Sequence, residues 1–219
     1  MKKMKMIYNT LMLIPIAVTL IGLHYLPERI PTHYNLANQA DRWGSKYELL
    51  AFPILVVFFG IFMRVLANYH KNQEKFGSNN ERICFISGII CMITFSFLNY
   101  YFLYVGSKSI ENISILAIDL EQFVFAMLGI VLIIIGNILP KIKMNSVTGL
   151  RTRWSMKNEV TWKKSQFFGG VSFLITGFII VIISFITKGI KCMILSLVIF
   201  GTAIIIDIFY TYWIAKKNN

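Results

Sequence analysis

The sequence predicts an all-α membrane protein that crosses the bilayer six times. Hydrophobic residues make up 56% of the 219 residues and charged residues only 15%, against about 25% charged in soluble domains. Six apolar runs are long enough to span a hydrocarbon core of about 30 Å as helices, the form in which such a run satisfies its own backbone hydrogen bonds in lipid. The runs cover about residues 6–26, 47–67, 83–105, 115–139, 166–187 and 190–214.

The distribution of basic residues predicts the orientation of these helices. If the N-terminus is inside the cell, the inner segments hold 16 of the 22 Lys and Arg residues and the outer segments hold the other 6. Basic loops are retained in the cytoplasm, so both termini are expected on that side. The net charge of +12 then reflects topology, and we expect no direct contact with nucleic acid.

The first polar segment, Leu26 to Lys46, reads LPERIPTHYNLANQADRWGSK and is expected outside the cell, between the first two spans. Its prolines restrict the backbone and its Asn and Asp residues favour turns, which predicts a compact, ordered loop. One interpretation is a lid that seals the helices. The other is a surface that recognises a molecule arriving from outside, with His33, Tyr34, Asn35, Asp41 and Trp43 as its candidate residues.

The basic loop, Pro140 to Ser165, reads PKIKMNSVTGLRTRWSMKNEVTWKKS between the fourth and fifth spans. Seven Lys and Arg residues stand against the single acid Glu159, which predicts a cytoplasmic loop. Arginines match phosphates as planar forks and tryptophans suit the membrane interface, so lipid anchoring and docking of a cytoplasmic protein are both open interpretations. The candidate residues are Asn137, Pro140, Lys141, Asn145, Gly149, Arg151, Thr152, Trp154, Trp162 and Lys164.

Three features predict the local structure around this loop. Gly136, Asn137 and Pro140 are expected to end the fourth helix. Gly149 permits a sharp turn. Ser155 is expected to cap a short helix that leads into the fifth span.

Small and charged residues inside the spans predict how the helices pack. Gly129 and Gly136 are seven positions apart, as are Gly170 and Gly177, so spans four and five are expected to pack closely across these faces. Ordinary glycine frequency in membrane helices is the alternative explanation. Asp207 lies inside the sixth span, where a carboxylate costs about 2.5–3.5 kcal/mol on insertion scales, so it is expected to face the helix bundle or water.

The two polar segments resemble those of the SdpI family of bacterial immunity proteins. Family members share GN-x-x-PK-x-x-x-N-x-x-x-G-x-RT-x-W and then W-x-K, which this sequence matches from Gly136 to Lys164. The module that often precedes it, LP-x-x-IP-x-H-(Y/F)-N and then D-x-W-GSK, is matched from Leu26 to Lys46. Asn38 stands where the family usually has glycine and is able to take the same left-handed turn, and Gln166 replaces a frequent histidine.

The resemblance implies two modules and a function. Residues 1–75 would form an N-terminal membrane module with its ordered outer loop at 27–46, and residues 76–219 a four-helix SdpI-like module with the basic loop at 140–165. The protein would lie in the bacterial cytoplasmic membrane and protect the cell against a secreted toxic or antimicrobial peptide. In the family's best-understood setting that toxin is the sporulation-delaying protein, and the toxin-engaged protein holds an autorepressor at the membrane.

The expected partners are therefore the lipid bilayer, a secreted toxin on the outside and a cytoplasmic transcriptional repressor. An enzyme is not expected, because His24, His33 and His70 are scattered and the sequence has neither HExxH nor an evident nucleophile with a base. The sequence accordingly predicts no catalytic residue, no metal and no cofactor.

A small membrane transporter or channel is the alternative function. Asp207, Asp119 or Glu121 would then be the polar group inside the membrane. The scarcity of other polar residues in the spans, and the lack of a repeat relating the two halves, argue against this alternative.

Overall fold

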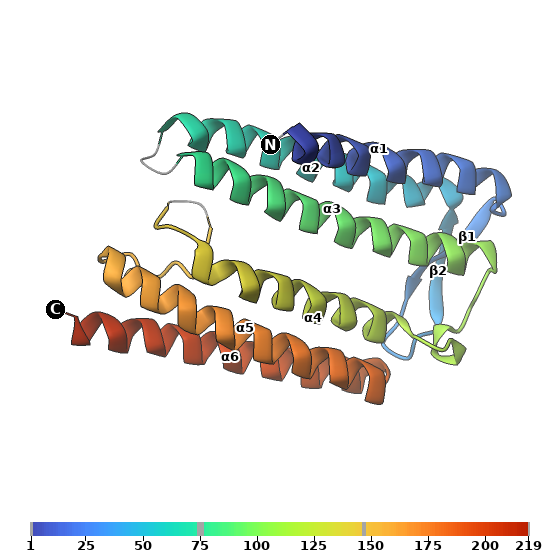
Figure 1. The fold of residues 1–219 in the computed structure, drawn as a ribbon. Coiled ribbons are helices and arrows are strands. Elements are labelled where there is room, and N and C mark those ends of the chain that lie inside the picture. The colour runs from blue at the N-terminus through green and yellow to red at the C-terminus, as the bar shows by residue number, and fades with distance from the viewer. Residues whose placement is uncertain (1, 74–76, 146–147, 219) are drawn as a thin grey trace. The chain divides into compact units, whose positions relative to one another are not determined.

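The computed structural model describes residues 2–73, 77–145 and 148–218, and within these residues the all-α fold with six spans is confirmed (Figure 1). Each of the six helices is long and apolar enough to cross a bilayer. The helices are α1 (Lys2–Tyr25), α2 (Ala51–Gln73), α3 (Gly77–Ser107), α4 (Leu120–Ile138), α5 (Glu159–Ile186) and α6 (Gly189–Lys217).

The ordered loop expected between the first two spans is a β-hairpin. Strands β1 (Arg29–Tyr34) and β2 (Ala40–Ser45) form a two-stranded antiparallel sheet. Short 3-10 helices lie directly before α2, in the connection between α3 and α4, and directly after α4: η1 (Lys46–Leu50), η2 (Ile113–Ile115) and η3 (Leu139–Lys141).

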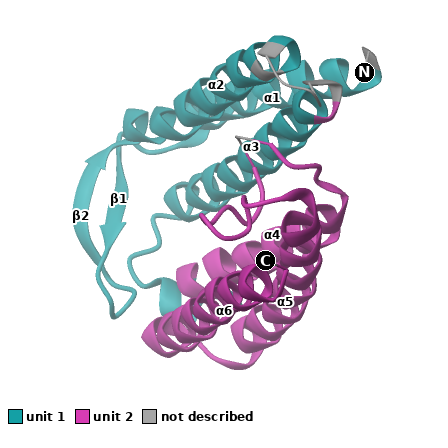
Figure 2. Ribbon diagram, turned by 90° about the vertical axis from the view of Figure 1, so that its left-hand side faces the viewer, with its two compact units in different colours: residues 1–73, 80–119 teal, residues 74–79, 120–219 magenta. Residues whose placement is uncertain are grey.

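The chain forms two compact units, coloured separately in Figure 2. Unit 1 consists of Met1–Gln73 and Asn80–Asp119, so it contains α1, the hairpin, α2 and most of α3. Unit 2 consists of Glu74–Asn79 and Leu120–Asn219 and contains α4, the basic loop, α5 and α6. The module boundary that the resemblance implies, at residue 75, lies outside the described residues, and the division into modules stays a prediction.

The core of unit 1 lies at the hairpin end of its helices. Leu23, Leu26, Ile30 and Leu49 are buried together, with Phe102 of α3 packed against them. Further along the helices, a buried hydrogen bond of 2.7 Å from Asn99 Nδ2 to Thr19 Oγ1 joins α3 to α1. Leu26 and Ile30 belong to the proline-containing motif, so one part of that motif anchors the hairpin in the apolar core.

Close packing of α4 against α5 in unit 2 confirms the prediction made from the glycine pairs. A Cβ atom added to Gly177 would lie 2.6 Å from the carbonyl oxygen of Gly129, and one added to Gly136 would lie 2.7 Å from that of Gly170. Only glycine allows two helix backbones to come this near, and close contact is what holds helices together in lipid. Beside this seam, Phe125, Leu132, Ile180 and Cys192 form a buried cluster that includes α6.

The predicted end of the fourth helix is confirmed, and one predicted cap is wrong. Helix α4 ends at Ile138, between Asn137 and Pro140, and η3 follows it. Ser155 does not cap a helix: α5 begins at Glu159, and the cap is Asn158, whose side chain accepts from Thr161 N–H at 2.8 Å. The Ser155 hydroxyl is instead used inside the basic loop, where it donates to Leu150 O.

Candidate functional site

The tip of the hairpin is built by asparagines. Asn35 Oδ1 accepts from Ala37 N–H at 2.9 Å and from Gln39 N–H at 3.1 Å, an arrangement typical of an Asx turn. Asn38 is buried and has φ 61°, so it takes the left-handed turn expected of it. The register shifts next to Thr32 and at Asp41, and such bulges redirect side chains and increase the twist of a strand.

The hairpin is fixed to the connection that follows α3. The Tyr34 hydroxyl donates to the Ile110 carbonyl at 2.6 Å, Ala40 N–H donates to Glu111 O at 2.7 Å, and Ile113 N–H donates to Asn38 O at 2.9 Å. Burial raises the pKa of Tyr34 to about 12. At its base, Lys46 is buried and pairs with Glu28 at 3.0 Å. Segments that are remote in sequence thus hold the hairpin in one place within unit 1.

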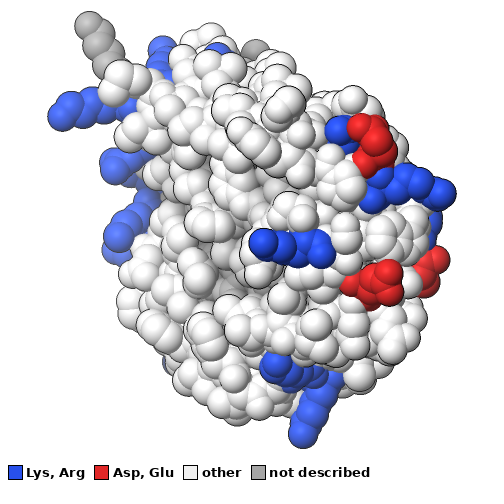
Figure 3. Space-filling model, turned by 90° about the vertical axis from the view of Figure 1, so that its right-hand side faces the viewer, with Lys and Arg blue, Asp and Glu red and all other residues white. Residues whose placement is uncertain are grey.

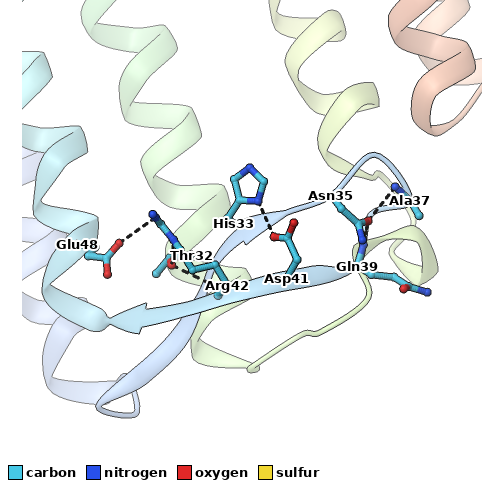
Figure 4. Close-up of polar contacts among 8 residues, drawn as sticks. All are labelled: Thr32, His33, Asn35, Ala37, Gln39, Asp41, Arg42 and Glu48. Atoms are coloured by element: carbon cyan, nitrogen blue, oxygen red, sulfur yellow. Dashed lines mark hydrogen bonds and ion pairs between the residues drawn. The ribbon is translucent and has the colours of Figure 1, made fainter.

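One face of the hairpin carries a row of charged and polar side chains (Figure 4). His33 Nδ1 lies 2.5 Å from Asp41 Oδ1, while Arg42 donates to Thr32 Oγ1 and Glu48 Oε2, both at 3.2 Å. These pairs are exposed. Figure 3 shows the surface as seen from the right-hand side of Figure 1, with acidic side chains next to some of the basic ones. We name this surface, Thr32, His33, Asp41, Arg42 and Glu48, the hairpin face.

The structure divides the five residues predicted for recognition into two groups. His33 and Asp41 lie on the hairpin face, and Trp43 is partly exposed on β2. Tyr34 and Asn35 are occupied by hydrogen bonds that shape the hairpin. The sequence reasoning missed Arg42 and Glu48. These residues meet because β2 ends at Ser45 and the chain turns into η1, whereas residues six positions apart on an extended strand would lie about 20 Å apart.

The basic loop has an internal scaffold of buried polar contacts. Buried Asn145 donates to the carbonyls of Lys143 and Thr148 and accepts from Thr148 N–H at 2.8 Å. Trp162 is 2% exposed and donates from Nε1 to the Ile142 carbonyl at 2.8 Å. Ser155 Oγ accepts from Thr152 N–H and donates to Leu150 O. Three motif residues therefore shape the loop and are not exposed for docking: Asn145, Trp162 and Thr152.

Gly149 and Gln166 complete the internal contacts of the basic loop. Gly149 has φ 109°, which disfavours any side chain, and an added Cβ would lie 2.7 Å from Gln166 Oε1. The Gln166 amide accepts from Leu150 N–H at 2.8 Å and donates to Leu150 O at 3.0 Å. The turn expected at Gly149 is confirmed. The role of Gln166 was missed, because its partner lies 16 positions away.

Further contacts tie the basic loop to the end of α6. Thr152 Oγ1 donates to Thr211 Oγ1 at 2.9 Å, and Lys164 Nζ donates to Asn218 Oδ1 at 2.9 Å. The Trp154 ring meets Tyr212 edge-on, with 5.4 Å between ring centroids. The predicted docking residues Thr152, Trp154 and Lys164 therefore lie together at one end of unit 2.

The surface of the basic loop is strongly cationic. Lys141, Arg151, Arg153 and Lys157 are exposed, and the Arg153 guanidinium lies 4.9 Å from the centre of the Trp154 ring. A groove of about 370 Å³ is lined by Pro140, Lys141, Ile142, Lys143, Met144, Glu159, Trp162 and Lys163. Asn137 is exposed, and its side chain donates to the Ile133 carbonyl in its own helix at 3.1 Å.

Asp207 lies where the sequence analysis expected it, inside the bundle of unit 2. It is 0% exposed. It is one turn before Thr211, which bonds to the basic loop. Among the described residues, no group of three or more His, Cys, Asp or Glu side chains is arranged to hold a metal ion.

Comparison with known proteins gives separate matches for an N-terminal and a C-terminal segment of the chain. Residues 141–211 match the SdpI/YfhL protein family, and residues 10–57 match a domain of unknown function, DUF1648. The chain is similar to the immunity protein SdpI of Bacillus subtilis (strain 168), with 26% identity over 202 residues, which is 92% of this chain and 90% of that protein. No solved structure matches the chain. The family resemblance found in the motifs is thereby confirmed.

Proposed function

We propose that this multi-pass protein of the bacterial cell membrane, which carries the SdpI family segment, is an immunity protein against a secreted toxic or antimicrobial peptide. The observation that carries the proposal is the similarity to an immunity protein over nine-tenths of both chains. The similarity includes both polar segments, which are the parts of the chain with the most elaborate local structure.

The hairpin face suits the recognition of a peptide outside the cell. Its charged side chains are exposed, and contacts to Ile110, Glu111 and Ile113 hold the strands in place. A surface that is already ordered loses little conformational entropy when it binds. In this proposal the hairpin lies on the outer side and the basic loop on the inner side, as the distribution of Lys and Arg predicts.

The exposed cations of the basic loop suit the docking of a cytoplasmic repressor. Arg151 and Arg153 project from a loop that Gln166 and Thr211 hold against α5 and α6. A ligand that favours one packing of α5 against α6 would therefore also change the position of the loop. Within unit 2, a change in the packing of α5 against α6 would therefore be signalled at the exposed surface of the basic loop.

Immunity is tested by survival. Cells that lack this chain and cells that express it are exposed to the sporulation-delaying protein toxin and to the spent medium of the organism that carries the gene. We expect the expressing cells to survive concentrations that kill the others. Equal killing in every case, together with solute flux through vesicles that contain the purified protein, would favour a transporter and contradict the proposal.

Docking is tested with a fluorescent fusion of a repressor encoded beside the gene. Replacing Arg151 and Trp154 together by Ala should release the fusion into the cytoplasm while the protein still inserts in the membrane. Lys191→Ala is the matched control, because it removes an exposed charge near the start of α6 and should leave the fusion at the membrane. A fusion that stays at the membrane in the double variant would show that the repressor docks elsewhere.

A further inference from the structure

The groove on the basic loop lies where two spanning helices meet the membrane surface. It has a volume of about 370 Å³. Among its lining residues, Pro140 and Lys141 come directly after the end of α4, and Glu159 is the first residue of α5. A ligand in the groove would therefore lie at the depth of the lipid headgroups, next to the hydrocarbon core that both helices cross.

The groove has an excess of positive charge. Lys141, Lys143 and Lys163 line it and are exposed, and Glu159 is the single acid in the lining. Three positive charges and one negative charge give the lining a net charge of +2. Glu159 is one turn before Lys163 on α5, yet the ion pairs of the described residues include neither of them, nor Lys141. Lys141 and Lys163 therefore keep their charges for an anionic ligand.

The segment that carries Lys141 and Lys143 is held in place by the residue between them. Ile142 is buried, its N–H donates to the Leu139 carbonyl at 3.0 Å, and its carbonyl accepts from Trp162 Nε1 at 2.8 Å. Both polar groups of the Ile142 backbone are thus satisfied inside the protein. Because this backbone is already ordered, a ligand would have to immobilise only the lysine side chains, which lowers the entropic cost of binding.

The groove also offers apolar surface that continues toward the lipid. Its remaining lining residues have largely apolar side chains: Pro140, Ile142, Met144 and Trp162. On α5, Phe167 follows Lys163 by one turn and Val171 by two, and their side chains are 63% and 42% exposed. Exposed apolar side chains on a spanning helix face lipid. A ligand with an anionic headgroup and acyl chains therefore matches both parts of this surface, whereas a soluble anion would use only the lysines.

We infer that this groove binds the headgroup of an anionic phospholipid, with the phosphate paired to Lys141 and Lys163 and an acyl chain along the exposed face of α5. Glu159 restricts the headgroup. Its carboxylate would repel a phosphate monoester, which carries a charge of about −1.5 to −2, but it is able to accept hydrogen bonds from the hydroxyl groups of a glycerol headgroup. Phosphatidylglycerol, a phosphodiester with such a headgroup, meets both conditions.

The inference goes beyond the proposed function, because its ligand is neither the toxin nor the repressor. It also separates two surfaces of the basic loop. Arg151 and Arg153, which the proposed function assigns to the repressor, do not line the groove. Lipid in the groove and a protein on the arginines would therefore not compete for the same side chains.

Native mass spectrometry of the purified protein in detergent measures the Kd of phosphatidylglycerol and of phosphatidylcholine with the same acyl chains. The variant Lys141→Ala/Lys163→Ala removes two cations of the groove. Lys157→Ala/Lys216→Ala is the matched control, because it removes two exposed cations that lie on the basic loop and in the last turn of α6 and do not line the groove. Met144→Trp fills part of the groove without changing its charge.

We expect the wild type to bind phosphatidylglycerol at least about tenfold more tightly than phosphatidylcholine, which corresponds to about 1.4 kcal/mol. The groove variant and Met144→Trp should each lose most of this preference, and the control should keep it. Equal affinity of the wild type for the two lipids would overturn the inference, and this comparison stands even where a variant fails to fold. An equal loss in the control variant would also overturn it, since the lipid would then respond only to the net charge of the loop.

Competition identifies any other occupant of the groove. Glycerol phosphate, which has the phosphate and glycerol but no acyl chains, should fail to displace phosphatidylglycerol at equal concentration. A peptide of ten aspartate and glutamate residues should also fail. Displacement by glycerol phosphate would show a site for a soluble anion, and displacement by the peptide would show a docking groove for an acidic protein. Either result would overturn the assignment to lipid.

Discussion

The side chain of Gln166 holds the backbone of Leu150 at both of its polar groups. One bond of 2.8 Å runs from Leu150 N–H to the amide oxygen, and one of 3.0 Å runs from the amide nitrogen to the Leu150 carbonyl. Because Gln166 is 1% exposed, water does not compete for these bonds. The first half of α5 thus fixes the middle of the basic loop, next to Arg151.

Gln166→Leu should loosen the basic loop without unfolding the helices. The substitution nearly keeps the side-chain size but leaves the N–H of Leu150 without a partner, at about 1–3 kcal/mol for a buried group, while the Leu150 carbonyl keeps only the bond from Ser155 Oγ. Trypsin should therefore cleave after Arg151 and Arg153 faster than in the wild type. Phe167→Leu, at an exposed neighbouring position, is the control and should be cleaved at the wild-type rate. Equal cleavage in both variants would show that Gln166 does not hold the loop.

Gly177→Ala should destabilise unit 2. The new Cβ would lie 2.6 Å from the Gly129 carbonyl oxygen and 2.8 Å from Ile133 Cγ1, so α4 and α5 would have to separate. Overpacking of this kind costs about 1–3 kcal/mol. Thermal unfolding in detergent provides the measurement. Gly201→Ala is the matched control, because nothing lies within 4 Å of its Cβ position, and the gain in helix propensity should leave Tm equal or higher. A Tm for Gly177→Ala as high as that of Gly201→Ala would contradict close packing.

Tyr34 makes the attachment of the hairpin sensitive to high pH. Burial raises its pKa from 10.0 to about 12, so the folded state keeps the phenol proton that the unfolded state loses. The stabilisation is fully present below about pH 10 and is lost as the pH rises toward 12. The tyrosinate absorbance of the wild type minus that of Tyr34→Phe should show one group titrating near pH 12. A difference transition near pH 10 would mean that the hydroxyl is not held against Ile110.

The parts of the fold that the sequence predicts are those set by local composition. Long apolar runs determine the six spans, and the spacing of glycines along α4 and α5 places them on facing sides. Asn38 and Gly149 are residue types that accept positive φ, so their turns were also foreseeable. Such features need no knowledge of what lies elsewhere in the chain.

The parts that escaped prediction depend on contacts between remote residues. The strand sequences RIPTHY and ADRWGS contain a proline and a glycine and lack regular alternation, and they are held by the 110–113 segment. The helix that leads into the fifth span was expected to begin after a cap at Ser155, yet it begins at Glu159 after the Asn158 cap, because the Ser155 hydroxyl donates to Leu150 O. The two hydrogen bonds between the Gln166 amide and the Leu150 backbone likewise had no signal in the local sequence.

Asn38→Ala should lower the amount of protein in the membrane. The buried backbone at this position has φ 61° and its carbonyl accepts from Ile113 N–H. A left-handed conformation costs an alanine about 1–2 kcal/mol. Asn38→Gly should keep the wild-type abundance, because glycine takes this conformation without that cost. Quantitative immunoblots of membrane fractions compare the three proteins, and equal loss in both variants would point to the side chain of Asn38 and not to its backbone.

Trp43→Ala provides the most direct test of recognition at the hairpin. Trp43 is the partly exposed aromatic residue beside the hairpin face, and truncation of an aromatic anchor in an interface costs about 2 kcal/mol or more. The measurement is the toxin concentration that halves the survival of expressing cells, with membrane abundance determined in parallel. We expect Trp43→Ala to lower that concentration at normal abundance, while Tyr47→Ala, at an exposed aromatic residue outside the strands, leaves it unchanged. Full resistance of Trp43→Ala cells at normal abundance would contradict the account and make the hairpin a structural lid.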